Sequence, residues 1–344
     1  MANTFTAAAP RLTGLTSRTF GIELEIGFKS ASGTPVPFST VKAKVMADLA
    51  AAGVDVRDES ATYNHVTRTW WKFVTDCSIG YENIELVSPI LSGAPALAEI
   101  EKISAVLVAN NVFVNKSMGF HVHQEARDLD LAACKRLARL VTRFKSVFDG
   151  LLPLSRRENP MCRHFDSMDL SRIDAATFKR AKESDLATSD SHRYRALNFA
   201  SISRHGTVEF RQHSGTFDAD KIIAWVLLTQ GLVEKAKVFG REKARVEAVA
   251  ATGDGLNMLL RTAGLRTCLP WGQKIAPEVE SRVRSAVATL RERAKKFGLI
   301  RLGERSEVRS RARRATAGSA SEAVAAAVAP VAPVATTGEA GAAQ

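Results

Sequence analysis

Apolar and polar residues alternate in four short stretches of the chain, which is the pattern of half-buried β-strands. The longest stretch covers residues 20–28, where every second residue from Phe20 to Phe28 is apolar. The other three stretches are residues 84–87, 120–123 and 207–211. Because successive side chains of a strand point to opposite faces, the apolar residues predict a core on one face and the polar residues share the other face.

The polar residues of these strands are mostly ionisable. Glu23 and Glu25 lie on the same face of the first strand, about 7 Å apart along it. If the four strands share that face, it carries Glu23, Glu25, Glu85, His121, His123, Glu209 and Arg211. Four carboxylates on one surface repel one another, so we expect raised pKa values unless cations neutralise the charge.

This set of residues favours a metal site. Oxygen-rich sites with few histidines suit Mg²⁺ or Mn²⁺ better than a closed zinc site. Arg211 adds a permanent positive charge, and arginine together with metal ions suits phosphoryl transfer. Two other interpretations stay open: a Glu-x-Glu pair is commonly a solvated sheet face, and His121 with His123 would bind zinc if a third ligand joined them. The common phase of the four strands favours the metal site.

Helical spacing of apolar residues occurs in four other stretches. These are residues 96–109, 137–151, 218–239 and 277–297. Asp218 can cap the third helix and Pro277 can open the fourth. The third helix is apolar almost all round from Ile222 to Val233, so we expect it to be buried. Strands and helices in one chain predict an α+β fold.

The two ends of the chain differ from the part between them. Residues 1–17 are small and polar without a clear period, and we expect a flexible arm. Residues 301–314 hold six arginines, and from Ala315 onward the chain is rich in Ala, Val, Pro and Gly. Because such a segment has little large apolar surface to offset its ordering entropy, we expect residues 301–344 to be a disordered tail. The remaining domain is residues 18–300.

Composition and charge narrow the class of protein. The 344 residues are 45% hydrophobic and 24% charged, which excludes a fibrous or wholly disordered chain. The chain has no run of about 20 apolar residues, which a membrane-spanning helix needs. We also expect no secretory signal, because the N-terminus lacks a basic segment followed by an apolar core. Four scattered cysteines predict reduced thiols in a cytoplasmic protein. The formal net charge of +12 suggests a polyanionic partner, of which nucleic acid is one candidate.

Several short motifs, in this order, resemble the amidoligase family, in the group of carboxylate–amine ligases that includes glutamine synthetase and glutamate–cysteine ligase. The resemblance spans about residues 18–240. The matching segments are Phe20–Glu25, Asp76–Ser78, Glu85–Pro89, Gly119–His123, Arg195–Asn198 and Thr207–Thr216. It implies a curved, mainly antiparallel sheet whose concave face holds ATP and two or more divalent metal ions, with helices packed on the other side and a helical C-terminal part.

The resemblance also implies roles for individual residues. Glu25 and Glu85 would hold one metal, and Glu23, His121 and Glu209 would hold the metal that bridges the ATP phosphates. The remaining roles are His123 near the nucleotide phosphates, Arg211 on the transferred phosphate, Arg195 as a second anion clamp, and Asp76 as the residue that positions the amine and takes its proton.

Other residues of the motifs carry weaker implications. Asn198 and His213 either support the site residues or contact substrate, or they have a purely structural role. The basic segment 155–162 either binds a substrate carboxylate or is a solvated loop. Two positions depart from the family pattern, with Cys77 where glycine is usual and Met118 where cysteine is common.

The implied activity is ATP-dependent formation of an amide or isopeptide bond through an acyl phosphate. The carboxylate and amine substrates would be small molecules, peptides or protein side chains, and no membrane is involved. One alternative is a metal-dependent hydrolase that uses His121, His123 and the carboxylates to activate water. The other is a nucleic-acid-binding protein, which rests only on the net charge. Because the predicted site face is acidic and the tail accounts for only +2 of the charge, we expect the basic excess around the site and on helix surfaces such as residues 135–145.

Overall fold

The computed structural model describes residues 18–61, 64, 66–76, 78–80, 83–175, 193–238, 247–265 and 277–298. All of them belong to the first of two units, residues 1–300, and the second unit is residues 301–344. The predicted arm of residues 1–17, the predicted tail of residues 301–344 and Cys77 lie outside the described residues.

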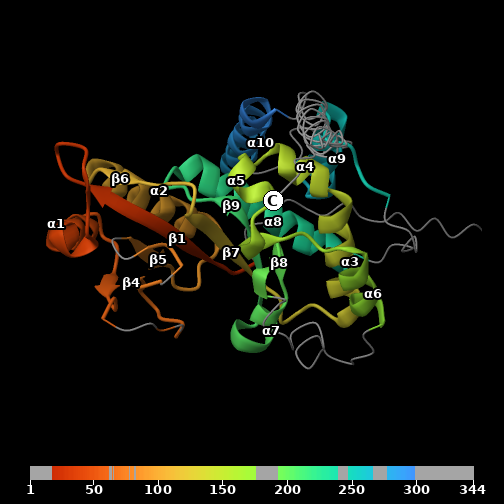
Figure 1. Cartoon of the computed structure of the whole chain (residues 1–344), viewed down its shortest axis with the longest axis horizontal. Helices are drawn as coiled ribbons and strands as arrows, with labels where there is room; N and C mark the ends of the chain where they lie inside the picture. The colour runs from red at the N-terminus through yellow and green to blue at the C-terminus, as the bar shows by residue number, and fades with distance from the viewer. Residues whose placement is uncertain are drawn as a thin grey trace, which may run out of the picture. The chain divides into compact units, whose positions relative to one another are not determined.

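The centre of the fold is a nine-stranded sheet with the order β3-β4-β5-β1-β7-β9-β8, to which β2 and β6 add by pairing with β1 (Figure 1). The strands are β1 Phe20–Lys29, β2 Pro35–Val36, β3 Val56–Asp58, β4 Trp71–Val74, β5 Ile84–Val87, β6 Val112–Phe113, β7 Gly119–Glu125, β8 Leu197–Asn198 and β9 Thr207–Ser214. All pairs are antiparallel except β3 with β4. The four strands that alternation predicts are β5, β1, β7 and β9, and they are direct neighbours.

Helices pack against this sheet and complete an α+β fold, as predicted. They are α1 Phe38–Ala51, α2 Gly93–Ala109, α3 Leu131–Arg143, α4 Lys145–Gly150, α5 Leu154–Arg157, η2 Pro160–Cys162, α6 Ser167–Ala175, α7 Ala200–His205, α8 Ala219–Lys237, α9 Gly253–Thr262 and α10 Pro277–Phe297. None of the described helices combines the length and the apolar composition that crossing a membrane requires.

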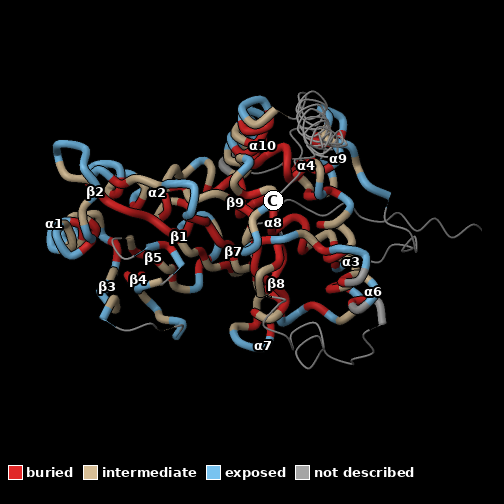
Figure 2. The backbone as a smooth tube through the Cα atoms, viewed as in Figure 1, coloured by how far each residue is buried: buried red, intermediate tan, exposed pale blue. Residues whose placement is uncertain are grey.

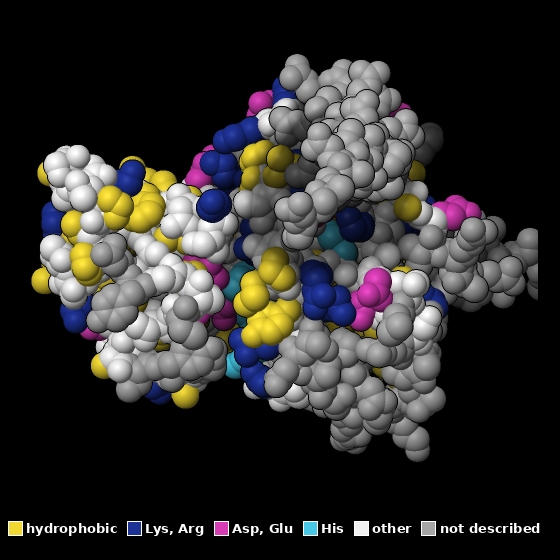
Figure 3. Space-filling view, viewed as in Figure 1, with side chains coloured by type: hydrophobic (Ala, Val, Ile, Leu, Met, Phe, Trp, Pro, Cys, Tyr) yellow, Lys and Arg dark blue, Asp and Glu magenta, His cyan; other side chains and the backbone are white. Residues whose placement is uncertain are grey.

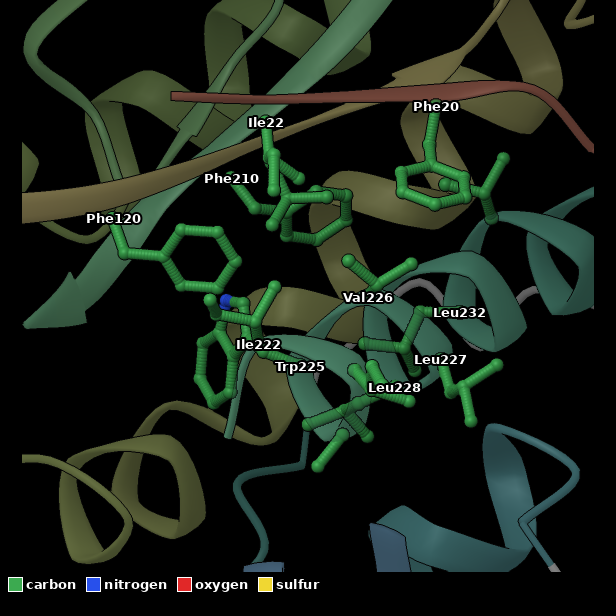
Figure 4. Packing of buried hydrophobic residues seen from close by; sticks show 14 of the residues in the cluster. Phe20, Ile22, Phe120, Phe210, Ile222, Trp225, Val226, Leu227, Leu228 and Leu232 are labelled. Atoms are coloured by element: carbon green, nitrogen blue, oxygen red, sulfur yellow. The ribbon is translucent and has the colours of Figure 1, made fainter. Parts of the chain in front are cut away.

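The apolar face of the sheet packs on α8. Ile22, Phe120 and Phe210 from three neighbouring strands lie against the helix, where Ile222 and Trp225 meet them (Figure 4). Figure 2 shows that β1 and α8 are largely buried, in agreement with the prediction that this helix is apolar almost all round. The Asp218 side chain accepts a hydrogen bond from the backbone N–H of Lys221, so the predicted cap is confirmed.

The predicted helix of residues 137–151 is two helices, α3 and α4. The break is at Phe144, whose φ of −95° and ψ of 12° depart from helical values. Phe144 itself is buried, and the apolar residues on both sides of it are buried or half-buried as well. The apolar face therefore continues through the break, and for this reason the periodicity did not reveal it.

Gly231 allows α8 to approach the end of α9, which gives a test of this packing. A Cβ atom at Gly231 would lie 1.9 Å from the backbone oxygen of Ala263. We expect Gly231→Ala to lower the free energy of unfolding by at least about 2 kcal/mol, because backbone must move to relieve the overlap. Gly253→Ala, where no atom lies within 4 Å of the new Cβ, is the control. Equal stability of the two variants in denaturant melts would contradict the packing.

Candidate active site

The register of the sheet brings the predicted ionisable residues together on one face. Glu25 lies opposite Glu85, and Glu23 lies opposite His121. Strand β9 adds Glu209, which lies opposite His123. Paired residues of antiparallel strands point to the same face, so this arrangement forms a cluster of carboxylates and imidazoles. Figure 3 shows acidic and histidine side chains in a hollow between the part that holds β4 and β5 and the part that holds β8.

His121 is at the centre of this cluster. Its Nδ1 atom lies 3.0 Å from Oε2 of Glu23 and 3.5 Å from Oε1 of Glu209. Its Nε2 atom lies 3.5 Å from Oε1 of Glu25. Both ring nitrogens therefore face carboxylates, although a neutral imidazole can donate from only one of them.

Two groups of side chains have the geometry to hold a metal ion. They are Glu23, His121 and Glu209, and Glu25, Glu85 and His121, with the ligand atoms of each group within 4.8 Å of one another. The two groups follow the predicted division of the ligands, except that His121 belongs to both. Each group offers two carboxylates and one imidazole, which suits a hard divalent ion.

The acidity of the carboxylates reflects their burial and their neighbours. Burial raises the pKa of Glu85 well above its usual value, and the charges of Glu23, Asp76 and Glu25 raise it further. Burial also opposes ionisation of Glu23, but the adjacent His123 and His121 outweigh it and hold its pKa well below the usual value. The pKa of Glu209 is lowered in the same way, despite burial, chiefly by Arg211. The predicted raised pKa is therefore found for Glu85, whereas neighbouring histidines and Arg211 lower the pKa of Glu23 and Glu209.

Arg211 and Asn198 fix the position of Glu209. The guanidinium Nη1 of Arg211 forms an ion pair with Oε1 of Glu209. The amide of Asn198 donates to Oε2 of the same carboxylate over 2.7 Å. Asn198 thus supports a carboxylate of the cluster, which fits the supporting role considered for it and not a purely structural one.

Asp76 and His123 lie at the border of the cluster. Asp76 follows β4, and its Oδ1 atom accepts the backbone N–H of Ser78 over 2.7 Å. His123 belongs to neither metal group. Its Nδ1 atom lies 3.1 Å from the hydroxyl of Ser201 and 3.0 Å from that of Thr207, and its Nε2 atom lies 3.2 Å from Oε1 of Glu23.

The structure does not bring Arg195 into the cluster. Its Nη2 atom donates to Oδ1 of Asp169 over 2.8 Å, and the residue is 9% exposed. The backbone N–H of Arg211 donates to the oxygen of Ala196, which continues the β8–β9 pairing. By alternation from this pair, Arg195 falls on the face opposite to Arg211.

His213 lies on the core face because β9 contains a bulge. Phe120 pairs with His213 and Val122 pairs with Phe210, so β9 has one residue more than β7 in this interval. The bulge reverses the alternation, and the His213 ring packs against Phe120 and Trp225 at centroid distances of 5.2 and 4.9 Å. Burial lowers the pKa of His213 well below its usual value. Of the two roles considered for His213, the structural one holds.

Three residues of the site were not among the predicted site residues. Gly119 donates its backbone N–H to Oε2 of Glu25 over 2.5 Å. Arg156, in the basic segment 155–162, is 5% exposed, so the segment is not simply a solvated loop at this position. Lys72 is 2% exposed and shares the face of Glu85, as the alternation between Trp71 and Phe73 could have indicated. Burial lowers the pKa of Lys72.

A pocket opens beside the cluster, at the ends of β1, β5 and β7. The empty space in and above it, open solvent included, is about 900 Å³. Its lining includes Gly21, Glu23, Lys72, Glu85, His123 and Thr207. Lys72 also holds one wall, because its Nζ atom donates to the Oδ1 atom of Asn64 over 2.7 Å and to the backbone oxygen of Val66 over 2.8 Å.

Comparison with protein families identifies the group to which this site belongs. A family model described as "Putative amidoligase enzyme" matches residues 16–233, which include every member of the cluster. The chain belongs to this amidoligase family. The predicted family resemblance is therefore confirmed. Enzymes called amidoligases join a carboxylate to an amine. No curated protein sequence matches the chain.

Three solved structures, among others, are similar to the chain at low sequence identity. For the complex between the prokaryotic ubiquitin-like protein Pup and its ligase PafA, the identity is 12%, the coverage is 83% of this chain and 65% of the other, and the TM-score is 0.36. A glutamine synthase homolog is 13% identical. The match covers 84% of this chain and 70% of the homolog, and the TM-score is 0.39. A bifunctional glutathione synthetase from Pasteurella multocida is 10% identical. The match covers 83% of this chain and 51% of the synthetase, and the TM-score is 0.41.

Proposed function

We propose that this protein is an ATP-dependent carboxylate–amine ligase that forms an amide or isopeptide bond through an acyl phosphate. The observation that carries the proposal is the position of His121 between two carboxylate groups, on a face that also carries Arg211. Membership of the amidoligase family supports the same chemistry.

Two divalent metal ions, Mg²⁺ or Mn²⁺, would be held by the carboxylates and His121. The donor set supports this, because each group provides mainly oxygen ligands, and burial together with the charges of neighbouring carboxylates raises the pKa of Glu85. Bound there, such ions would reduce the repulsion between the phosphates and the attacking carboxylate. The same donor set argues against a zinc hydrolase based on the His-x-His pair, since His123 belongs to neither group.

In the first step, a carboxylate oxygen of the acid substrate would attack the γ-phosphorus of ATP, and ADP would leave. Arg211 would stabilise the negative charge on the transferred phosphoryl group. Its pairing with Glu209 holds the guanidinium beside the cluster. His123 would donate from Nε2 to a phosphate oxygen, and the hydroxyls of Ser201 and Thr207 beside Nδ1 would hold the ring in place.

In the second step, the amine nitrogen would attack the acyl carbon and inorganic phosphate would leave. Asp76 would anchor the amine and accept its proton. The half-buried position of Asp76 next to Glu85 supports this role, because its charge is strong enough there to raise the pKa of Glu85. Arg195 was also predicted as an anion clamp, but its ion pair with Asp169 favours a structural role.

The pocket beside Glu23 and His123 would receive the nucleotide. It adjoins the group predicted to hold the phosphate-bridging metal, and its lining is partly apolar, with Val66 and Ile90 exposed to solvent. The acid and the amine would be small molecules, peptides or protein side chains. Residues 18–300 would form the catalytic domain.

The proposal is tested by product analysis with Mg²⁺, ATP and paired libraries of acids and amines. We expect ADP and phosphate in equal amounts, and only when both an acid and an amine are present. Mass spectrometry should then find a product equal to the two substrates minus water. Turnover of a substrate without nucleotide would instead support the hydrolase. Salt-sensitive DNA binding that survives Glu23→Gln would support the nucleic-acid-binding alternative.

A further inference from the structure

Arg156 is a buried cation next to the cluster, and its guanidinium binds only neutral acceptors among the described residues. It is 5% exposed and has no carboxylate partner within 4.0 Å in the described part of the chain. Its Nη2 atom donates to the backbone oxygen of Arg211 over 2.5 Å, and its Nε atom donates to that of Gln212 over 3.3 Å. Because burial of an uncompensated charge is costly, such a residue needs an explanation.

The two carbonyl groups that Arg156 binds lie within the bulge of β9. Between the pairs Val122 with Phe210 and Phe120 with His213, β9 places Arg211 and Gln212 opposite the single residue His121. A bulge interrupts the regular ladder and leaves backbone groups without their usual partners. Arg156 supplies donors to both residues of the bulge, on the strand that carries Glu209 and Arg211.

Arg156 also borders the Glu25 side of the cluster. The point where a Cβ atom of Gly119 would stand is 3.2 Å from Nη2 of Arg156, 2.9 Å from Nε2 of His121 and 3.4 Å from Oε1 of Glu25. Its own backbone is fixed as well, since its N–H donates to the oxygen of Pro153 over 3.0 Å. The guanidinium therefore connects the segment 154–157 to the bulge next to the metal ligands.

We propose that Arg156 is a positioning residue that holds the β9 bulge and thereby directs Arg211 at the phosphoryl group. This inference rests on the proposed function, in which Arg211 contacts that group. The planar guanidinium can donate to two carbonyl oxygens at once in a fixed geometry, whereas the single ammonium of lysine cannot reproduce this fork. Charge alone should therefore not replace Arg156.

The test measures nucleotide binding, which requires neither the acid nor the amine. Calorimetry with Mg²⁺ compares ADP with the non-hydrolysable triphosphate β,γ-imido-ATP in wild type, Arg156→Lys, Arg156→Gln and Arg211→Lys. We expect both Arg156 variants to lose at least about 10-fold of the preference for the triphosphate, as Arg211→Lys does, with ADP affinity unchanged. Arg157→Gln is the matched control, because Arg157 also donates to two backbone oxygens, those of Leu152 and Phe297.

A double variant shows whether Arg156 acts through Arg211. If it does, adding Arg156→Gln to Arg211→Lys should reduce the preference no further. Additive losses would overturn the proposal, as would an unchanged preference in folded Arg156 variants or the same loss in Arg157→Gln. Unfolding of both Arg156 variants would also overturn it, because the role would then be one of general stability. Failure of the wild type to bind either nucleotide would overturn the proposed function itself.

Discussion

Glu25→Gln is expected to lower ADP formation by about 100- to 1,000-fold, because a bound metal ion contributes several kcal/mol to transition-state stabilisation. The amide keeps the shape of the side chain but removes the charge of a residue that both faces His121 and pairs with Glu85. The measurement is the rate of ADP release with the full set of substrates. Glu101→Gln, which removes an exposed partner of Arg282, is the control and should keep the wild-type rate.

Thermal melts of the same variant separate the loss of a ligand from the loss of the fold. Without divalent ions, Glu25→Gln should melt at or above the wild-type temperature, because one of the charges that raise the pKa of Glu85 is gone. With saturating Mg²⁺ or Mn²⁺ the wild type should gain stability by mass action and the variant should gain less. Equal gains for both proteins, or ADP release by the variant at the wild-type rate, would refute the assignment of Glu25 as a metal ligand.

Gly119→Ala is expected to lower turnover by at least about 100-fold while changing the melting temperature by only a few degrees, since small displacements of reacting groups can cost this much. The new Cβ would lie 2.9 Å from Nε2 of His121 and 3.4 Å from Oε1 of Glu25. These atoms are the ends of side chains, so they can move aside without disturbing the core. The movement would nevertheless separate the ligands of one predicted metal. Activity assays and melts on the same preparation measure both effects.

Gly253→Ala is the matched control for this substitution, because nothing lies within 4 Å of its Cβ position. Its turnover should equal that of the wild type. Wild-type turnover of Gly119→Ala would show that the close approach of Gly119 to His121 and Glu25 is not needed for activity. A loss of the fold in Gly119→Ala would show that the contact is part of the core.

Much of the carboxylate and histidine cluster could be predicted from alternation along single strands. Period two is a local property, so it identified the common phase of Glu23, Glu25 and Glu85 without any knowledge of pairing. Extended beyond Arg211, the same argument would place His213 on the wrong face, because His213 is in phase with Glu209 and Arg211 in the sequence. A bulge needs only one additional residue, and nothing in the residue types around Arg211 and Gln212 marks it.

Arginine side chains were the least predictable part of the site. Arg195 and Arg156 are both buried, but each has a different partner. Arg195 pairs with Asp169 of α6, and Arg156 donates to backbone of β9. A long flexible side chain can reach several elements, so its partner depends on which elements lie nearby and not on its neighbours in the sequence.

The sequence by itself determined which ionisable residues share one face of their strand, where the long helices lie and which ions suit carboxylate and imidazole ligands. These properties follow from local periodicity and residue chemistry. Only the tertiary structure decided that β5, β1, β7 and β9 are neighbours, that His121 belongs to both metal groups and that Arg156 supports the bulge. These features depend on contacts between residues far apart in the chain. Strand order and register depend on how the strands pair to bury one common apolar face, which no single segment encodes.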